Sequence, residues 1–207
     1  MSFEYVPGAQ VETPEIPWEA EIVLPAAQSA VVVVDMQNDF VTEGGTLVVP
    51  AATDTLPTIA GLLQKARHAG ARVTYTQDTH REGDPEWEIW PEHCRKDSWG
   101  WQIVDALAPQ PGEMVFQKSR YDGFYDTGLD HYLSRVWGVR HLVVVGTIAS
   151  ICVLHTAGSA GLRWFHVVAA ADTMSALTTF DQALALRQIS WLYAGKVAKS
   201  ADAIRFE

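Results

Sequence analysis

Short apolar runs rich in β-branched residues recur along the chain and are separated by longer amphipathic segments. This alternation is typical of a parallel sheet wrapped by helices, because strands buried on both faces are apolar throughout. We therefore predict an α/β protein with a three-layer, α-β-α doubly wound fold and a six-stranded, mainly parallel sheet. The expected strands are Ala30–Asp35, Ala71–Asp78, Glu113–Lys118, His141–Gly146, His166–Asp172 and Lys196–Ile204.

Helices are expected between these strands. Apolar residues at helical spacing form one face at Leu56, Ile59, Leu62, Leu63 and Ala66, and a second at Leu129, Leu133, Val136 and Trp137. Further helices are predicted near Ser98–Leu107, Ile151–Trp164 and Phe180–Tyr193.

The chain length of 207 residues fits one folded domain, which we place at residues 29–207. The segment 1–28 is polar and interrupted by prolines. We predict that it is an N-terminal arm, either an extended sheet edge or a subunit contact.

Composition excludes several classes of partner. The net charge of −10 argues against nucleic acid, because an acidic surface repels a phosphate backbone. The longest apolar runs, such as Ala30–Val34 and Leu142–Val145, are far shorter than the roughly 20 residues of a membrane-spanning helix, so no membrane partner is expected. The start, MSFEYVPG, lacks the features of a signal peptide, which predicts a cytoplasmic protein whose 2 cysteines are free thiols.

Chemically capable side chains follow four of the predicted strands. Asp35, Asp78 and Lys118 end the first three strands, and Cys152 follows the fourth, where a helix should begin. The carboxyl ends of parallel strands lie along one edge of a sheet, where ligands bind in such folds. Each residue alone is more often a solvated charge or a small core thiol. Their joint placement predicts an active site.

A carboxylate, an ammonium group and a thiol at one edge can form an activated nucleophile. Asp35 follows four valines, so burial should raise its pKa and suit it to accept a proton. We expect the helix N-terminus to lower the pKa of Cys152, and the positive charge of Lys118 to favour the thiolate further.

Around these residues the sequence resembles the isochorismatase-like cysteine hydrolases, which include nicotinamidases, N-carbamoylsarcosine amidases and amidases of ureido compounds. The resemblance covers about Ala30 to Ile204 and is carried by DMQNDF at Asp35, KSRYDGFYDTGLD at Lys118 and GTIASICVLHTAG at Cys152. It implies that Asp35 takes the thiol proton, Lys118 helps to hold the charges in place and Cys152 attacks a carbonyl carbon.

The same resemblance implies a cis peptide bond between Thr147 and Ile148. It further implies that the backbone N–H groups of Ile148 and Cys152 bind the oxyanion. The isochorismatases that give the superfamily its name lack this cysteine, so Cys152 indicates amide or urea chemistry.

A metal site is predicted beside the thiol. Asp78 and His80 lie two residues apart at a strand end, on one side of an extended chain, and His93 follows after a loop. Two imidazoles and a carboxylate are a competent ligand set for zinc or a similar divalent ion. Nicotinamidases have this Asp-x-His with a later His, so the resemblance supports zinc here. The segment REGDPEWEIW departs from their pattern and is more similar to N-carbamoyl and small-amide hydrolases, where these positions can shape a pocket without a metal.

Two residues close in sequence to the predicted ligands and nucleophile are expected to be structural and not catalytic. Cys94, next to His93, is predicted to be a buried free thiol instead of a fourth ligand. His155 lies one helical turn after Cys152 and is aimed along the helix, and Asp35 already serves as the base.

The substrate pocket is predicted to be lined by Phe40, Trp90, Tyr121 and Phe124. Arg120 is a candidate to bind a substrate carboxylate. The tryptophan-rich segment after His80 is expected to pack as a pocket wall or against a second subunit.

The first functional hypothesis is a cysteine amidohydrolase that cleaves a small carboxamide, such as nicotinamide, through a thioester with release of ammonia. An N-carbamoyl or ureido compound is the alternative substrate. A non-catalytic ligand-binding relative would have no reason to retain Asp35, Lys118 and Cys152 together, and a redox protein is disfavoured because no C-x-x-C pair is present. No organic cofactor is predicted. By the resemblance, the chain should form a homo-oligomer, a dimer or tetramer.

Overall fold

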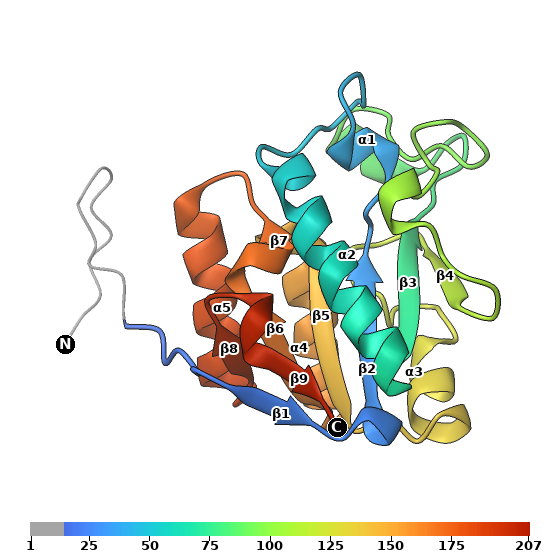
Figure 1. The fold of residues 1–207 in the computed structure, drawn as a ribbon. Coiled ribbons are helices and arrows are strands. Elements are labelled where there is room, and N and C mark those ends of the chain that lie inside the picture. The colour runs from blue at the N-terminus through green and yellow to red at the C-terminus, as the bar shows by residue number, and fades with distance from the viewer. Residues whose placement is uncertain (1–14) are drawn as a thin grey trace.

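The computed structural model describes residues 15–207, which form a sheet between two layers of helices (Figure 1). Six parallel strands pair in the order β4-β3-β2-β5-β6-β8, and a short strand, β7, pairs with the end of β5. This is the α/β architecture predicted from the sequence. The strands are β2 (Ser29–Val34), β3 (Arg72–Asp78), β4 (Met114–Lys118), β5 (His141–Thr147), β6 (His166–Ala170), β7 (Met174–Ser175) and β8 (Lys196–Ala198).

The strand order reverses between β2 and β5. From β2 the chain runs outward through β3 to β4, and it then returns to the other side of β2 with β5. In open parallel sheets, ligands bind outside the carboxyl ends of the strands at such a reversal. The topology therefore points to the ends of β2 and β5.

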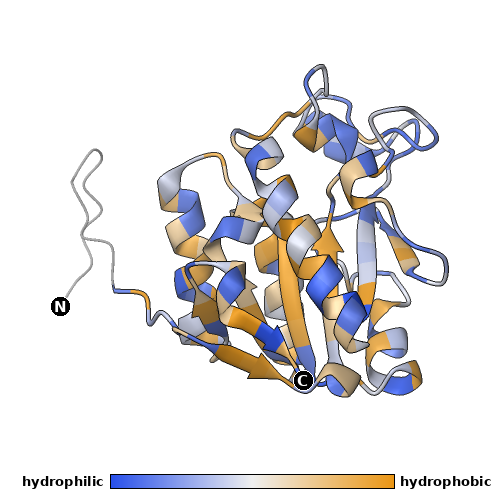
Figure 2. Ribbon diagram, viewed as in Figure 1, coloured by the Kyte–Doolittle hydropathy of each residue, from blue (hydrophilic) through white to orange (hydrophobic). Residues whose placement is uncertain are grey.

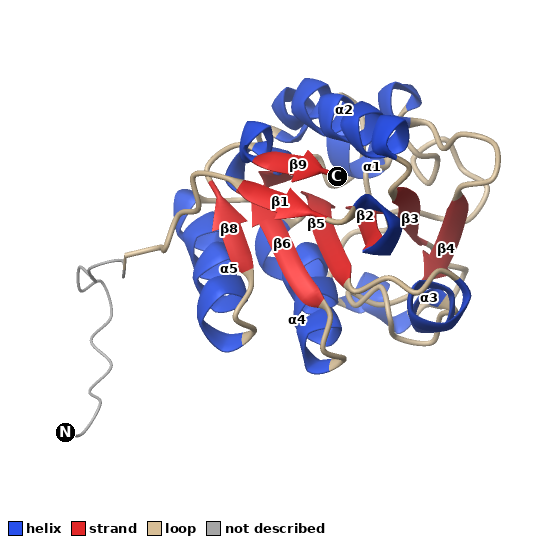
Figure 3. Ribbon diagram, turned by 60° about the horizontal axis from the view of Figure 1, so that its bottom comes forward, coloured by secondary structure: helices blue, strands red, loops and turns tan. Residues whose placement is uncertain are grey.

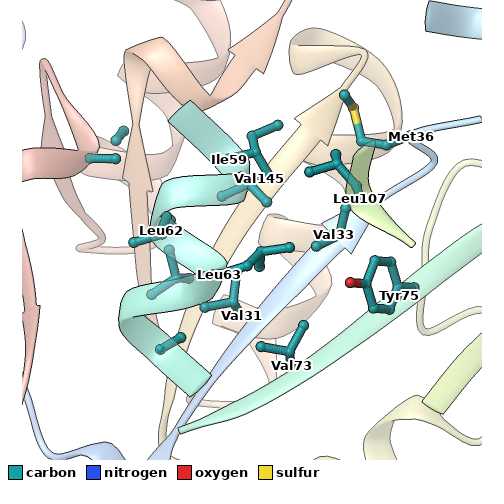
Figure 4. Close-up of a cluster of buried hydrophobic side chains, with 14 of the residues drawn as sticks. Val31, Val33, Met36, Ile59, Leu62, Leu63, Val73, Tyr75, Leu107 and Val145 are labelled. Atoms are coloured by element: carbon teal, nitrogen blue, oxygen red, sulfur yellow. The ribbon is translucent and has the colours of Figure 1, made fainter. Parts of the chain in front are cut away.

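Alternate residues of β2 face the two helical layers. Val31 and Val33 belong to the core cluster beneath α2 (Ala52–Ala69), as Figure 4 shows. Val32 and Val34 belong to the cluster on the opposite face. Because both faces are covered, residues 30–34 of this strand are all apolar, and Figure 2 shows that the neighbouring β5 is hydrophobic over most of its length.

The second helical layer lies on the other face of the sheet from α2 (Figure 3). It contains α3 (Leu129–His131), α4 (Leu154–Leu162) and α5 (Thr179–Leu192). The remaining helix, α1 (Asn38–Val41), follows β2. Single turns of 3-10 or π-helix occur at Ala26–Gln28, Pro85–Glu88, Asp105–Leu107, Tyr132–Val136, Ala149–Val153, Ala171–Thr173 and Ala201–Ala203. No helix within residues 15–207 is both long enough and apolar enough to cross a membrane.

The helix predicted near Ser98–Leu107 is wrong. This segment is a loop with one short 3-10 turn at its end. Its backbone is hydrogen-bonded to the segment that follows β2. The carbonyl oxygen of Trp101 accepts a hydrogen bond from the side-chain amide of Gln37 at 2.8 Å. The carbonyl oxygen of Gly100 accepts one from the backbone N–H of Asp39 at 2.9 Å. The apolar residues of the loop thus reflect packing over the strand ends and not a helical face.

The last predicted strand, Lys196–Ile204, divides into two. Only β8 joins the main sheet, and β9 (Ile204–Phe206) pairs in parallel with β1 (Ile22–Leu24) in a separate small sheet. The predicted arm, 1–28, therefore includes a strand packed against the rest of the chain. Its first part, residues 1–14, lies outside the described residues.

Candidate active site and metal site

The carboxyl ends of β2, β3 and β4 bring the predicted charged residues together. Asp35 follows β2 directly, Asp78 ends β3 and Lys118 ends β4, and Asp78 and Lys118 are register partners. Asp35 has a φ of 51°, in the left-handed region, and the chain turns there, with Gln37 donating its backbone N–H to the Asp35 carbonyl at 2.8 Å. The turn ends the strand and leaves the carboxylate at the sheet edge.

Lys118 connects the two carboxylates and the thiol. Its Nζ lies 2.7 Å from Oδ2 of Asp35, 3.1 Å from Oδ1 of Asp78 and 3.7 Å from Sγ of Cys152. All four side chains are buried. Burial alone would lower the pKa of Lys118, but the carboxylates of Asp35 and Asp78 raise it well above its usual value. The ammonium group therefore stays charged at the thiol.

Asp35 retains a carboxylate oxygen that can take a proton. The hydroxyl of Thr76 donates to Oδ1 at 2.8 Å, whereas Oδ2, although close to Lys118, accepts no well-aligned hydrogen bond from the described residues. Burial raises the pKa of this carboxyl, and the charge of Lys118 opposes that rise. Asp35 is thus a stronger base than an exposed aspartate, as the sequence predicted.

Cys152 lies in the first turns of the helix that follows β5, within the π-helical turn before α4. The expectation that this position lowers the pKa of its thiol is wrong. Burial raises the pKa of Cys152 well above the usual value, and the opposing effect of Lys118 does not compensate. The free cysteine therefore rests as a thiol and needs a base before it can attack.

The backbone before Cys152 has the conformation that the family resemblance implied. The peptide bond between Thr147 and Ile148 is cis. Gly146 precedes it with a φ of 118°. Ile148 and Cys152, the predicted oxyanion donors, both line the cavity at this edge of the sheet.

A metal-binding group lies next to the thiol. Asp78, His80, Glu86 and His93 are all buried, and one donor atom from each lies within 4.8 Å of the others. Oδ2 of Asp78 is 3.0 Å from Nε2 of His80 and 3.3 Å from Nε2 of His93. The three ligands predicted from the sequence therefore meet. Glu86 was missed because it lies in the loop after β3, where no strand or helix periodicity marks its direction.

The hydrogen bonds behind the imidazoles fit a cation between them. Nδ1 of His93 lies 2.7 Å from the carbonyl oxygen of Pro91, which can only accept, so the ring proton is on Nδ1 and a neutral ring turns its Nε2 lone pair toward Asp78. Nδ1 of His80 is held by Asp84 at 2.9 Å in the same way. Such backing by a carbonyl or carboxylate is usual for histidines that bind metals. The donor set suits a divalent ion such as zinc.

A cavity of about 260 Å³ opens above Cys152. Of the predicted pocket residues, Phe40, Trp90 and Tyr121 line it, whereas Phe124 and Arg120 do not. Phe124 is buried against Phe165 in the core, with ring centroids 6.1 Å apart. Thr46, Leu47, Val48, Ile148, Ile151 and Leu177 complete the wall together with Asp78, Glu86, His93 and Cys152.

The two residues given structural roles do not join the chemistry. Cys94 is fully buried and free, it is not part of the metal-binding group, and its backbone N–H donates to the Asp39 carboxylate at 2.7 Å. Nδ1 of His155 lies 2.7 Å from the carbonyl oxygen of Ile151, and the His155 ring packs on Tyr121. Both observations agree with the sequence interpretation.

Comparison with known proteins agrees with this geometry. Residues 29–202 match the isochorismatase domain family. The chain belongs to this family. A ureidoacrylate amidohydrolase RutB from Caulobacter segnis is 34% identical over 201 residues, covering 84% of this chain and 83% of the relative.

Solved structures of related enzymes have the same fold. An N-carbamoylsarcosine amidase from Thermoplasma acidophilum has a TM-score of 0.76 and 32% identity, covering 84% of this chain and 97% of that one. A pyrazinamidase of Pyrococcus horikoshii in complex with zinc has a TM-score of 0.77 and 27% identity, covering 83% and 98% of the two chains. This member of the family is accordingly a hydrolase of C–N bonds. The curated relatives favour the ureido alternative over the carboxamide that the sequence put first.

Proposed function

We propose that the protein hydrolyses a small N-carbamoyl or ureido compound, with Cys152 as the nucleophile. The observation that carries this proposal is the buried contact of Lys118 with both Asp35 and Cys152, at 2.7 Å and 3.7 Å. It joins a base, a cation and a thiol beside a cavity that only a small molecule can enter.

The first half-reaction begins with proton transfer from the thiol to Asp35. The sulfur then attacks the carbonyl carbon, and the backbone N–H groups of Ile148 and Cys152 stabilise the developing oxyanion. Asp35 returns the proton to the departing nitrogen as the C–N bond breaks, so that ammonia or an amine leaves and a carbonyl group stays bound to the sulfur, as a thiocarbamate from a urea or a thioester from a carboxamide. Lys118 offsets the negative charge on Asp35 and on the sulfur.

In the second half-reaction water attacks the carbonyl carbon of this covalent intermediate. Asp35, again ionised, accepts a proton from this water, and the C–S bond breaks to regenerate the thiol. For a ureido substrate that has lost ammonia, the product is a carbamate, which decomposes to an amine and carbon dioxide. A carboxamide would follow the same path to a carboxylate, which makes it the second candidate substrate.

A divalent ion, zinc by preference, would be held by Asp78, His80, Glu86 and His93. When bound, it supplies a positive charge that can orient a polar atom of the substrate. Purified protein dialysed against zinc should bind about one equivalent, as expected for a set of three or four protein ligands. His93→Ala should abolish this binding, whereas His68→Ala, a change at an exposed histidine of α2, should leave it unchanged. Equal zinc content in both variants would contradict the site.

Release of ammonia or amine from a panel of monosubstituted ureas and carboxamides tests the function. We expect wild-type protein to turn over ureas faster than carboxamides. Cys152→Ala should be inactive while its circular dichroism and melting temperature stay close to wild type, because the substituted side chain is only slightly smaller. Residual turnover above about one hundredth of the wild-type rate in that variant would refute the nucleophile assignment.

A further inference from the structure

The cavity above Cys152 has an apolar wall. Phe40, Leu47, Val48, Trp90, Ile148, Ile151 and Leu177 supply it. The charged groups that reach the cavity are the carboxylates of Asp78 and Glu86, and no lysine or arginine of residues 15–207 lines it. A substrate group placed against this wall therefore loses water without gaining a cationic partner.

Three basic groups close to the cavity lining are already engaged. Burial alone would lower the pKa of His80, but hydrogen bonds to Asp78 at 3.0 Å and Asp84 at 2.9 Å raise this pKa to about 9, so the imidazolium is paired with those carboxylates. Lys118 lies 2.7 Å from Asp35 and 3.1 Å from Asp78. The guanidinium group of Arg120 lies 3.1 Å from Asp84 and 3.6 Å from Glu86, and Arg120 does not line the cavity. Arg120, which was predicted from the sequence to bind a substrate carboxylate, thus pairs with acidic side chains of its own chain.

A bound metal ion does not reverse this balance. A divalent cation held by Asp78 and Glu86 would neutralise those two carboxylates and leave no positive charge in excess. An anionic substrate would therefore find no free cation at this cavity, and a charge left unpaired against its apolar wall is strongly disfavoured.

Tyr121 provides a neutral donor in this wall. Its hydroxyl accepts the indole N–H of Trp90 at 3.0 Å, which leaves its own proton without an acceptor among residues 15–207. This phenol proton can be donated to a carbonyl, ether or ring nitrogen of a substrate, so a neutral polar atom finds a partner in the wall without needing a cation.

From these observations we infer that the substrate carries an uncharged, largely apolar substituent on its urea or amide group, and that the cavity selects against carboxylates. The inference rests on the proposed function and narrows it. By this inference the chain prefers a neutral substrate and does not act efficiently on an acidic ureido compound, although the curated relatives of the chain are ureidoacrylate amidohydrolases.

Two pairs of nearly isosteric compounds test the selectivity. In the urea series, isopentylurea is compared with N-carbamoyl-β-alanine, in which a carboxylate replaces the terminal isopropyl group. In the amide series, isocaproamide is compared with succinamate. We expect kcat/KM for the neutral member of the preferred series to exceed that of the anionic member by at least about ten-fold. Calorimetric binding of the same compounds to Cys152→Ala should show the same order.

A cation added to the wall should reverse the preference. Val48→Lys places an ammonium group at the cavity, at a residue whose 45% exposure tolerates a long side chain. It should shift the neutral-to-anionic ratio about ten-fold toward the anion. Val23→Lys is the matched control, since Val23 is 44% exposed and lies on β1, away from the cavity, and its ratio should match wild type.

The outcomes separate the inference from the function on which it rests. Wild-type turnover of the anionic member at an equal or higher kcat/KM overturns the inference and leaves the amidohydrolase intact. If no member of either pair is hydrolysed or bound, the inference and the proposed function both fail. Should Val48→Lys not fold, as judged by circular dichroism, the wild-type ratio decides alone.

Discussion

At the scale of single residues, the site depends on how buried charges compensate one another. Two carboxylates and one ammonium group are buried together at Asp35, Asp78 and Lys118. Removing Lys118 would leave two carboxylates without their shared cation in the interior, which is far more costly than the pairing is beneficial. The raised pKa of Cys152 follows from the same burial, so the thiol depends on Asp35 and Lys118 for activation.

The hydroxyl of Thr76 affects the pKa of Asp35, so replacing it tests the role of Asp35 as the base without removing the carboxylate. Its hydrogen bond lowers the pKa of Asp35 and so opposes the rise that burial causes. Thr76→Val should raise this pKa further. Because protonated Asp35 cannot accept the thiol proton, activity is lost as pH falls through its pKa. The acid limb of the kcat/KM profile should therefore move up by about one pH unit, with little change on the plateau.

Thr74→Val is the matched control for this shift. Thr74 lies two residues earlier on β3, is equally buried, and donates its hydroxyl to the carbonyl of Met114 at 2.8 Å instead of to Asp35. Both variants lose one buried hydrogen bond, so both should lose a similar amount of stability. An acid limb that moves equally in both would show that Asp35 does not set it.

At the scale of elements, the sequence predicts what depends on burial periodicity and misses what depends on loop contacts. The strands β2, β5 and β6 were found because two-sided burial makes most of their residues apolar. The strands β3 and β4 were found from their β-branched and aromatic residues. The three charged strand-end residues were found because the carboxyl ends of parallel strands lie along one edge of the sheet. The direction of a loop side chain depends on long-range hydrogen bonds, such as that of Gln37 to Trp101. Glu86 in the metal-binding group was missed for this reason, and Arg120 and Phe124 were wrongly given to the pocket.

Gly146 illustrates an element-scale constraint that can be measured. It has a φ of 118°, and a Cβ at this position would lie 2.1 Å from the carbonyl oxygen of Val34 on the neighbouring strand. Gly146→Ala should therefore force β5 away from β2, lowering the free energy of unfolding by more than about 3 kcal/mol or preventing folding. Chemical denaturation measures the loss.

Gly112→Ala separates the clash from the cost of the backbone conformation. Gly112 also has a positive φ, 92°, but a Cβ there meets no atom within 4 Å. This variant should lose only about 1–2 kcal/mol, the cost of a left-handed conformation for an L-residue. If the two variants lose equal stability, close approach of the strands is not what selects glycine at position 146.

At the scale of the whole molecule, the site and the β1–β9 pair lie at opposite ends of the sheet. The functional side chains follow the strands near α1, while β1 and β9 pair at the other end (Figure 1). Sequence periodicity placed β9 in a longer strand and treated residues 1–28 as an arm, because a three-residue strand offers too little pattern to show which sheet it joins. The small sheet covers the same face of the main sheet as α2, and its buried residues belong to the same core cluster.

If β1 is an integral part of this core, its buried face must contribute to global stability and not to catalysis. Ile22 is completely buried and is the register partner of Ile204. Ile22→Ala should lower the free energy of unfolding by about 2–5 kcal/mol, the usual cost of such a truncation in a well-packed core.

The neighbouring Val23 is 44% exposed, so Val23→Ala should change stability by no more than about 0.5 kcal/mol. In both variants kcat/KM should stay at the wild-type value, because the strand lies far from Cys152. Equal and small losses in denaturant titrations of the two variants would mean that β1 does not belong to the core.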